Sequence, residues 1–124
     1  MLLYEKSLLA WLQDLNAGWG TNGVFFEEAE AKQEEPFLVL QPISGSGARD
    51  AGVLHPIVQL DVYHTDKYMA VELAERITSG LYLQRALYEG IRIESVVAER
   101  MRAVKVEDGT WKIPIRIRFF CQED

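Results

Sequence analysis

The chain has few of the residues on which metal sites, covalent catalysis and cross-links depend. Its 124 residues include one cysteine, Cys121, and two histidines, His55 and His64. A single cysteine excludes an internal disulfide and the paired cysteines of zinc and redox sites. The sequence also contains no HxH, HExxH or GxSxG spacing. We therefore expect no enzyme activity, no bound metal and no cofactor.

A basic excess and long apolar runs are missing as well. The formal net charge is −6, whereas a tight nucleic-acid binder usually carries a basic excess. No apolar stretch approaches the roughly 20 residues that span a bilayer. Near the N-terminus, Glu5, Lys6 and Asp14 interrupt the apolar residues, which argues against a signal peptide. We expect no membrane partner, no tightly held DNA and a location inside the cell.

The composition is that of a folded protein with a core. Hydrophobic residues make up 48% of the chain and charged residues 26%, which is typical of globular domains and not of disordered chains. The length suits one ordinary domain and not two. We therefore expect a single domain over residues 1–124.

The first half of the chain predicts one helix and two strands. Leucines at helical spacing predict a helix from about Leu3 to Asn16. A glycine-rich loop follows, in which Trp19 either folds back over the core or contacts a partner. Strands are expected over residues 24–28 and 37–43, separated by an acidic connection. The Gly/Ser-rich loop 44–52 lacks the spacing of a phosphate-binding loop.

Residues 56–77 begin like a strand and end like a helix. Apolar residues alternate from Val58 to Val62, and Thr65 or Asp66 then caps a helix. Asp61, His64 and Asp66 at this junction are residue types that hold metals or move protons. An odd separation on a strand places Asp61 and His64 on opposite faces. A strand end followed by a helix cap is therefore the preferred interpretation. The expected apolar stripe of the helix is Ala70, Leu73, Ala74, Ile77 and Leu81.

The last third predicts a long hairpin. One strand covers about residues 91–106 and the other Trp111 to Cys121, joined by a two-residue turn at Asp108-Gly109. Residues 81–90 are expected to be an irregular or short helical connection. Regular pairing would bury Arg100 and Arg102. We therefore predict a one-residue bulge near Ala103, which places Met101 opposite Ile115 and Val97 opposite Phe119. The predicted class is α+β, with an antiparallel or mixed sheet and two main helices packed on one face.

Several segments, taken in order, resemble a bacteriophage family. These are the tail-completion or tail-terminator proteins, which also act as head–tail joining and minor capsid-like proteins. EPFLVLQPIS resembles the early strand of the family, and HPIVQLDVYHTDKYMAVELAERITSGL resembles its central strand and helix. VVAERMRAVKVEDGTWKIPIRIRFF resembles its closing hairpin. The similarity spans about residues 37–120 and depends on order and spacing, since no single motif is specific.

The resemblance implies a structural virion protein of phage or prophage origin that is not an enzyme. Such proteins form a ring, commonly of six copies, that ends the tail tube and presents a surface to the head. DNA passes through the lumen without specific binding. The implied partners are further copies of the chain, the tail tube protein and head–tail connector proteins. The implied location is the head–tail interface of the virion, and the host cytoplasm during assembly.

A ring requires two different surface patches that meet head to tail. We hypothesise that an acidic patch and a basic patch of this chain meet across the subunit boundary, the alternative being two unrelated solvated faces. Trp19, Arg49 and Asp50 are the expected loop contacts to tail or head. The acidic patch is Glu27, Glu28, Glu30, Glu34 and Glu35, and the basic patch is Arg100, Arg102, Lys112, Arg116 and Arg118.

Two other functions remain open at this stage. A small ligand-binding or regulatory module of ferredoxin-like α+β type would be a monomer or dimer with an apolar pocket. An adaptor that uses the basic hairpin on nucleic acid would bind DNA in a salt-dependent way.

Overall fold

The computed structural model describes residues 3–30, 32–43, 48–50, 53–106 and 109–123. In these residues the chain forms two helices and one sheet of nine strands. No helix in these ranges is long and apolar enough to cross a membrane. The helices are α1 (Leu3–Trp19) and α2 (Lys67–Gly80). The strands are β1 (Val24–Phe26), β2 (Phe37–Pro42), β3 (Ala48–Asp50), β4 (Val53–His55), β5 (Ile57–His64), β6 (Arg85–Tyr88), β7 (Ile91–Arg100), β8 (Val104–Lys105) and β9 (Trp111–Glu123).

Strand β9 is the centre of the sheet. It pairs antiparallel with β5 and β4 along one side and with β7 and β8 along the other. Beyond β5 follows β2, antiparallel, and then β1, which is parallel to β2. On the other side, β6 pairs antiparallel with β7. The sheet is therefore mixed, and the predicted α+β class with its C-terminal hairpin is confirmed.

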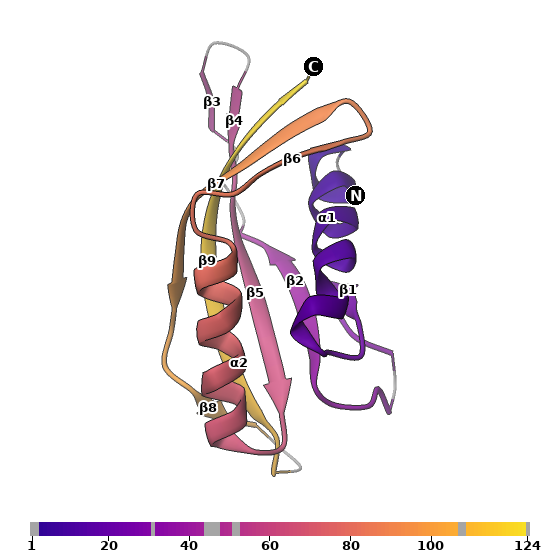
Figure 1. The fold of residues 1–124 in the computed structure, drawn as a ribbon, viewed down its shortest axis with the longest axis vertical. Helices are drawn as coiled ribbons and strands as arrows, with labels where there is room; N and C mark the ends of the chain where they lie inside the picture. Colours follow the sequence, from indigo (N-terminus) through magenta and orange to yellow (C-terminus); the bar gives the residue numbers. More distant parts are fainter. Residues whose placement is uncertain (1–2, 31, 44–47, 51–52, 107–108, 124) are drawn as a thin grey trace.

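The sheet curls, so that its two halves both reach α1. Figure 1 shows β6 crossing over the helix near the N-terminus while β1 lies beside its other end. The hydroxyl of Ser7 donates to the carbonyl of Tyr88 at 3.2 Å, and Tyr88 in turn donates to Asp14. These contacts join residues more than 70 positions apart. The helix therefore closes the space between the two outer strands.

The core lies between the helices and one face of the sheet. Strict alternation in β9 sends Ile113, Ile115, Ile117 and Phe119 to this face, where all four are fully buried. Trp11 of α1 meets Phe119 edge to face, with ring centroids 6.1 Å apart. Each such side chain contributes about 1.5–3 kcal/mol by burial. We call the opposite face of the sheet, which neither helix covers, the open face.

Helix α2 follows its predicted pattern. Its N-cap is Asp66, whose Oδ1 accepts from the backbone N–H of Met69 at 3.0 Å. This carboxylate satisfies one of the free donors of the first turn and favours the positive end of the helix dipole. The predicted apolar stripe is buried along its whole length, up to Leu81. Of the two cap residues proposed, Asp66 is the one that caps.

Three predicted segments differ from the structure. Helix α1 continues through Gly18 to Trp19, where Gly20, with φ of 71°, ends it. The connection after α2 contains strand β6, because Arg85 to Tyr88 pair with Glu94 to Ile91. The expected loop 44–52 contains β3, which pairs with β4 and extends the β2–β5 hairpin into the arm at the top of Figure 1. Residues 44–47, 51 and 52 lie outside the described residues.

The register of the C-terminal hairpin is also different. Lys105, not Val106, lies opposite Trp111, and Arg100, not Met101, lies opposite Ile115. Between the pairs Arg100–Ile115 and Val104–Lys112, three residues, 101–103, face two residues, 113 and 114, so the predicted bulge near Ala103 exists. A second irregularity between Ser95 and Val97 places Ser95 opposite Phe119. Of the predicted turn, Asp108 lies outside the described residues.

Candidate functional site

The strand–helix junction does not bring its three polar residues together. Asp66 caps α2, and the Nδ1 atom of His64 accepts from the backbone N–H of Asp66 at 3.0 Å. Asp61 lies on the open face of β5, where its carboxylate meets two amides instead. In the described part of the chain, no group of three His, Cys, Asp or Glu side chains is close enough to hold a metal. The junction is therefore built as a turn and a cap.

Asp61 is the unusual member of this group because it is fully buried. Its Oδ2 accepts from the amide of Gln41 at 2.7 Å, and its Oδ1 accepts from the amide of Gln59 at 2.9 Å. Burial raises the pKa of this carboxyl, although the charge of Lys112 and the Gln59 hydrogen bond partly oppose the rise. The alternating pattern predicted an outward position for Asp61 but not its burial beneath neighbouring polar side chains.

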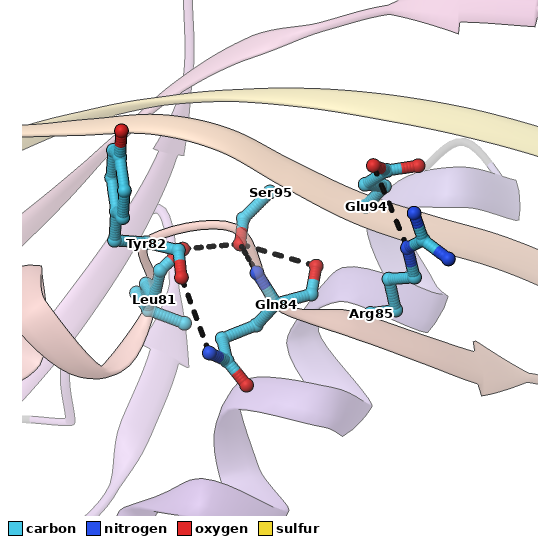
Figure 2. A network of polar contacts seen from close by, with 6 residues as sticks. All are labelled: Leu81, Tyr82, Gln84, Arg85, Glu94 and Ser95. Atoms are coloured by element: carbon cyan, nitrogen blue, oxygen red, sulfur yellow. Dashed lines mark hydrogen bonds and ion pairs between the residues drawn. The ribbon is translucent and has the colours of Figure 1, made fainter.

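Cys121 and Ser95 are buried side chains with nucleophilic atoms. Burial raises the pKa of the Cys121 thiol to about 12, so it stays protonated at neutral pH. Ser95 is fully buried and fixes the segment that follows α2 (Figure 2). Its hydroxyl donates to the carbonyl of Leu81 and accepts from the backbone N–H of Gln84 at 3.0 Å. Ser95 holds the segment after α2 in place and Cys121 packs in the core, and neither is arranged as an activated nucleophile.

The open face carries part of the predicted basic patch. Arg116 and Arg118 are exposed there, and Lys112 is half-buried near Asp61. All three belong to β9, which has neighbouring strands on both sides, so they lie in the middle of the sheet and not at its margin. A shallow hollow of about 530 Å³ lies higher on the same sheet. Its lining includes Val53, Leu87, Phe120, Arg85, Arg92 and Glu94.

The other two members of the predicted basic patch lie elsewhere. Arg100 ends β7 and reaches toward α2, where its Nη2 is 3.6 Å from Oε1 of Glu75. Arg102 follows in the exposed segment that leads to β8. The structure therefore divides the five basic residues between the open face and the β7–β8 margin. The cause is the pair of irregularities in β7 and after it, which change the side to which Arg100 points.

The predicted acidic patch forms an anchored connection between β1 and β2. The side-chain amide of Asn22 donates to the carbonyls of Glu34 and Glu35, at 3.3 and 3.1 Å. The hydroxyl of Thr110 donates to Oε1 of Glu35 at 2.6 Å, so this carboxylate is engaged within the chain. The remaining acidic residues of the patch are exposed to solvent, namely Glu27, Glu28, Glu30 and Glu34.

Of the predicted loop contacts, the structure describes Trp19 with its side chain and describes only the backbone of Arg49 and Asp50. Trp19 is half-buried and packs against the core, and the carbonyl of the same residue accepts from Arg76 at 2.9 Å. The sheet includes the backbone of Arg49 and Asp50, which pair with Leu54 and Val53. Both therefore belong to the arm formed by β3 and β4.

Sequence reasoning missed several exposed residues at the β7–β8 margin. Met101 and Val104 are 37% and 48% exposed, although both are apolar. Lys105 is exposed beside them, with its Nζ 6.0 Å from the ring centroid of Trp111. The signal available in the sequence was the break in alternation around Arg102, which we interpreted as a bulge and not as an exposed margin.

Comparison with known proteins shows similarity at the level of the fold. No protein-family model matches the chain, and no curated protein sequence matches it. A chain from a solved structure titled "Virion of native gene transfer agent (GTA) particle" matches with a TM-score of 0.64 and 16% identity, covering 98% of both chains. A second solved structure, whose title gives no function, matches with a TM-score of 0.64 and 15% identity, covering 98% of this chain and 92% of that one.

Proposed function

We propose that this chain is a structural protein of a phage-like virion and not an enzyme. The observation that carries this proposal is the fold shared, over 98% of both chains, with a chain of the gene transfer agent particle. The side chains of the strand–helix junction agree with it, because they are used for a cap and for hydrogen bonds within the sheet. The 124 residues would act as one domain.

Within that class, we propose the role of a tail-completion or tail-terminator protein. Copies would form a ring, with six as the expected number, that ends the tail tube and joins it to the head. The partners are other copies of the chain, the tail tube protein and the head–tail connector proteins. A net charge of −6 suits a lumen through which DNA passes without being held, because phosphate affinity depends on Lys and Arg.

The first experiment is the solution mass of the purified chain. Light scattering over a wide concentration range and at two salt levels, followed by negative-stain imaging, reveals any closed ring. A ring of identical subunits would support the tail-terminator role. A protein that stays monomeric and is absent from the tail ends of purified particles would contradict it.

One observation favours a second function. The hollow on the open face is lined by apolar residues, which include Val53 and Phe120, and by charged side chains. A small ligand-binding or regulatory module would place its ligand in such a hollow. A stable dimer that retains a small molecule after purification would favour this function over the ring.

A further inference from the structure

The two margins of the lower half of the sheet carry opposite charges. One margin is the acidic edge, formed by Glu27, Glu28, Glu30 and Glu34 in the connection after β1. The other is the basic edge, formed by Arg100, Arg102 and Lys105 at the end of β7 and in β8. Strands β2, β5 and β9 lie between them. Figure 1 shows the two margins on opposite sides of the molecule.

The two edges also lie at the same height along the strands. The paired residues can be followed from one strand to the next across the whole sheet. One such row begins at Phe26, directly before the acidic edge, and ends at Arg100, the first residue of the basic edge. With strands roughly 4.8 Å apart, its four steps span about 19 Å. The row is Phe26, Leu40, Leu60, Ile115 and Arg100.

We infer that the acidic edge of one copy meets the basic edge of the next copy, and that this contact builds the ring. The inference rests on the proposed ring and identifies the surface through which it forms. The occupant of each edge is therefore a second copy of this chain. Charge complementarity selects it, since each copy carries both edges and neither edge matches itself.

The common height of the edges determines which assembly results. A head-to-tail contact closes into a ring when it involves rotation alone, and it produces an open helix when each step also adds a translation. Because one row joins the residue before the acidic edge to the first residue of the basic edge, the two edges begin at the same height, and the contact adds little displacement along the strands. Copies joined in this way form a flat ring whose axis runs along the strand direction.

The basic edge has the exposure that such a contact requires. Met101 and Val104 lie between its cations and remain 37% and 48% exposed, so they supply apolar surface for the neighbour. Arg100 is held by Glu75, whereas no ion pair involves Arg102 within the described residues. Within those ranges, no ion pair involves the four carboxylates of the acidic edge either. Exposed pairs contribute little individually, so they set orientation while the apolar residues add contact area.

The test reverses the charge of one edge at a time. Arg102→Glu with Lys105→Glu gives a chain with two acidic edges, and the triple change Glu28→Lys, Glu30→Lys and Glu34→Lys gives a chain with two basic edges. We expect each variant alone to lose all species larger than the monomer. Mixed in equal amounts, they should assemble again, because unlike chains can alternate around a ring. Native mass spectrometry with one variant isotope-labelled should then find only even-membered rings with equal numbers of both chains.

A matched control changes the same charge elsewhere. Arg116→Glu with Arg118→Glu reverses two cations on the open face of the central strand, and it should assemble like the unaltered protein. Thermal unfolding of all variants verifies that each is folded. Rings that persist in both edge variants would overturn the inference while leaving the proposed ring intact. Loss of assembly in the control alone would assign the contact to the open face and would also overturn it.

The last outcome concerns the oligomeric state of the unaltered protein. If it stays monomeric at every concentration, the two edges do not associate and the inference fails. The proposed function would still be tested separately, by the presence or absence of the chain at the tail ends of purified particles.

Discussion

At the position of Asp61, two amide side chains replace the water that a carboxylate would otherwise bind. Gln41 and Gln59 donate to its two oxygens, and the group is fully buried on the open face. Burial raises the pKa of Asp61 above 3.8, so the folded chain holds this proton to a higher pH than the unfolded chain does. The stability that this proton contributes is present below pH 3.8 and is lost as the pH rises through the folded-state pKa.

The first prediction concerns a variant in which this carboxyl group no longer titrates. Asp61→Asn keeps the shape of the side chain but stays neutral at all pH values. We expect the unfolding free energy of the variant, relative to the unaltered protein, to increase as the pH rises from about 3 to about 7. Urea unfolding across this range measures the difference. Glu72→Gln, at an exposed position in α2, serves as the control. If the curves of Asp61→Asn and the unaltered protein run parallel across the pH range, the prediction is contradicted.

The second prediction concerns the polar contacts in Figure 2. Ser95→Ala removes the donor to the Leu81 carbonyl and the acceptor for the Gln84 N–H. Because the site is buried, both backbone groups lose a partner that water does not replace. We expect a loss of about 1–3 kcal/mol in unfolding free energy by urea titration. Ser79→Ala, at an exposed position in α2, should change stability by less than about 0.5 kcal/mol. Equal effects of the two variants would show that the contacts are dispensable.

Among the elements, those with local signals were predictable. The signals for helix α2 all lie within one continuous segment. They are the Asx/Thr residues that end the preceding strand, the cap and the apolar stripe, and the sequence predicted each of them. Strand β6 has no such signal, because Arg85 to Tyr88 become a strand only by pairing with β7. The register of β7 was missed for a similar reason. The irregularity lies next to Ser95, which forms hydrogen bonds with Leu81 and Gln84. The residues adjacent to Ser95 in the sequence do not predict these bonds.

The third prediction tests which residue begins α2. The sequence allowed Thr65 or Asp66, and the structure assigns the cap to Asp66 through its bond to Met69. Asp66→Ala should therefore cost about 1 kcal/mol of unfolding free energy, while Thr65→Ala should be nearly neutral. Thermal or urea unfolding of the two variants provides the comparison. A larger loss for Thr65→Ala would mean that the hydroxyl, and not the carboxylate, caps the helix in solution.

For the whole molecule, the sequence predicted the class of fold but not the positions of the charged patches. Element order and alternation were sufficient for an α+β fold with a closing hairpin. The division of the basic residues between the open face and the basic edge required the strand order and both irregularities. Lys112 and Arg102 show this most directly, since both were assigned to one wet face but belong to the middle and the margin of the sheet.

The fourth prediction follows from the opposite charges of the two edges. Salt screens exposed charges beyond about 10 Å at 0.1 M and beyond about 3 Å at 1 M. Association of copies should therefore weaken as NaCl is raised over this range, with slower formation of rings as the first sign. Light scattering at fixed protein concentration measures both. Assembly that strengthens with salt would indicate that apolar contacts dominate.

Strand β9 follows, in the chain, every strand with which it pairs. As the protein leaves the ribosome, β4, β5, β7 and β8 emerge before their common neighbour, so none can complete its pairing until residues 111–123 have been made. The contacts that close the sheet connect distant parts of the chain, which slows folding and leaves apolar strands exposed meanwhile. Until then, β7 and β8, which carry the basic edge, lack the strand that holds them in the sheet.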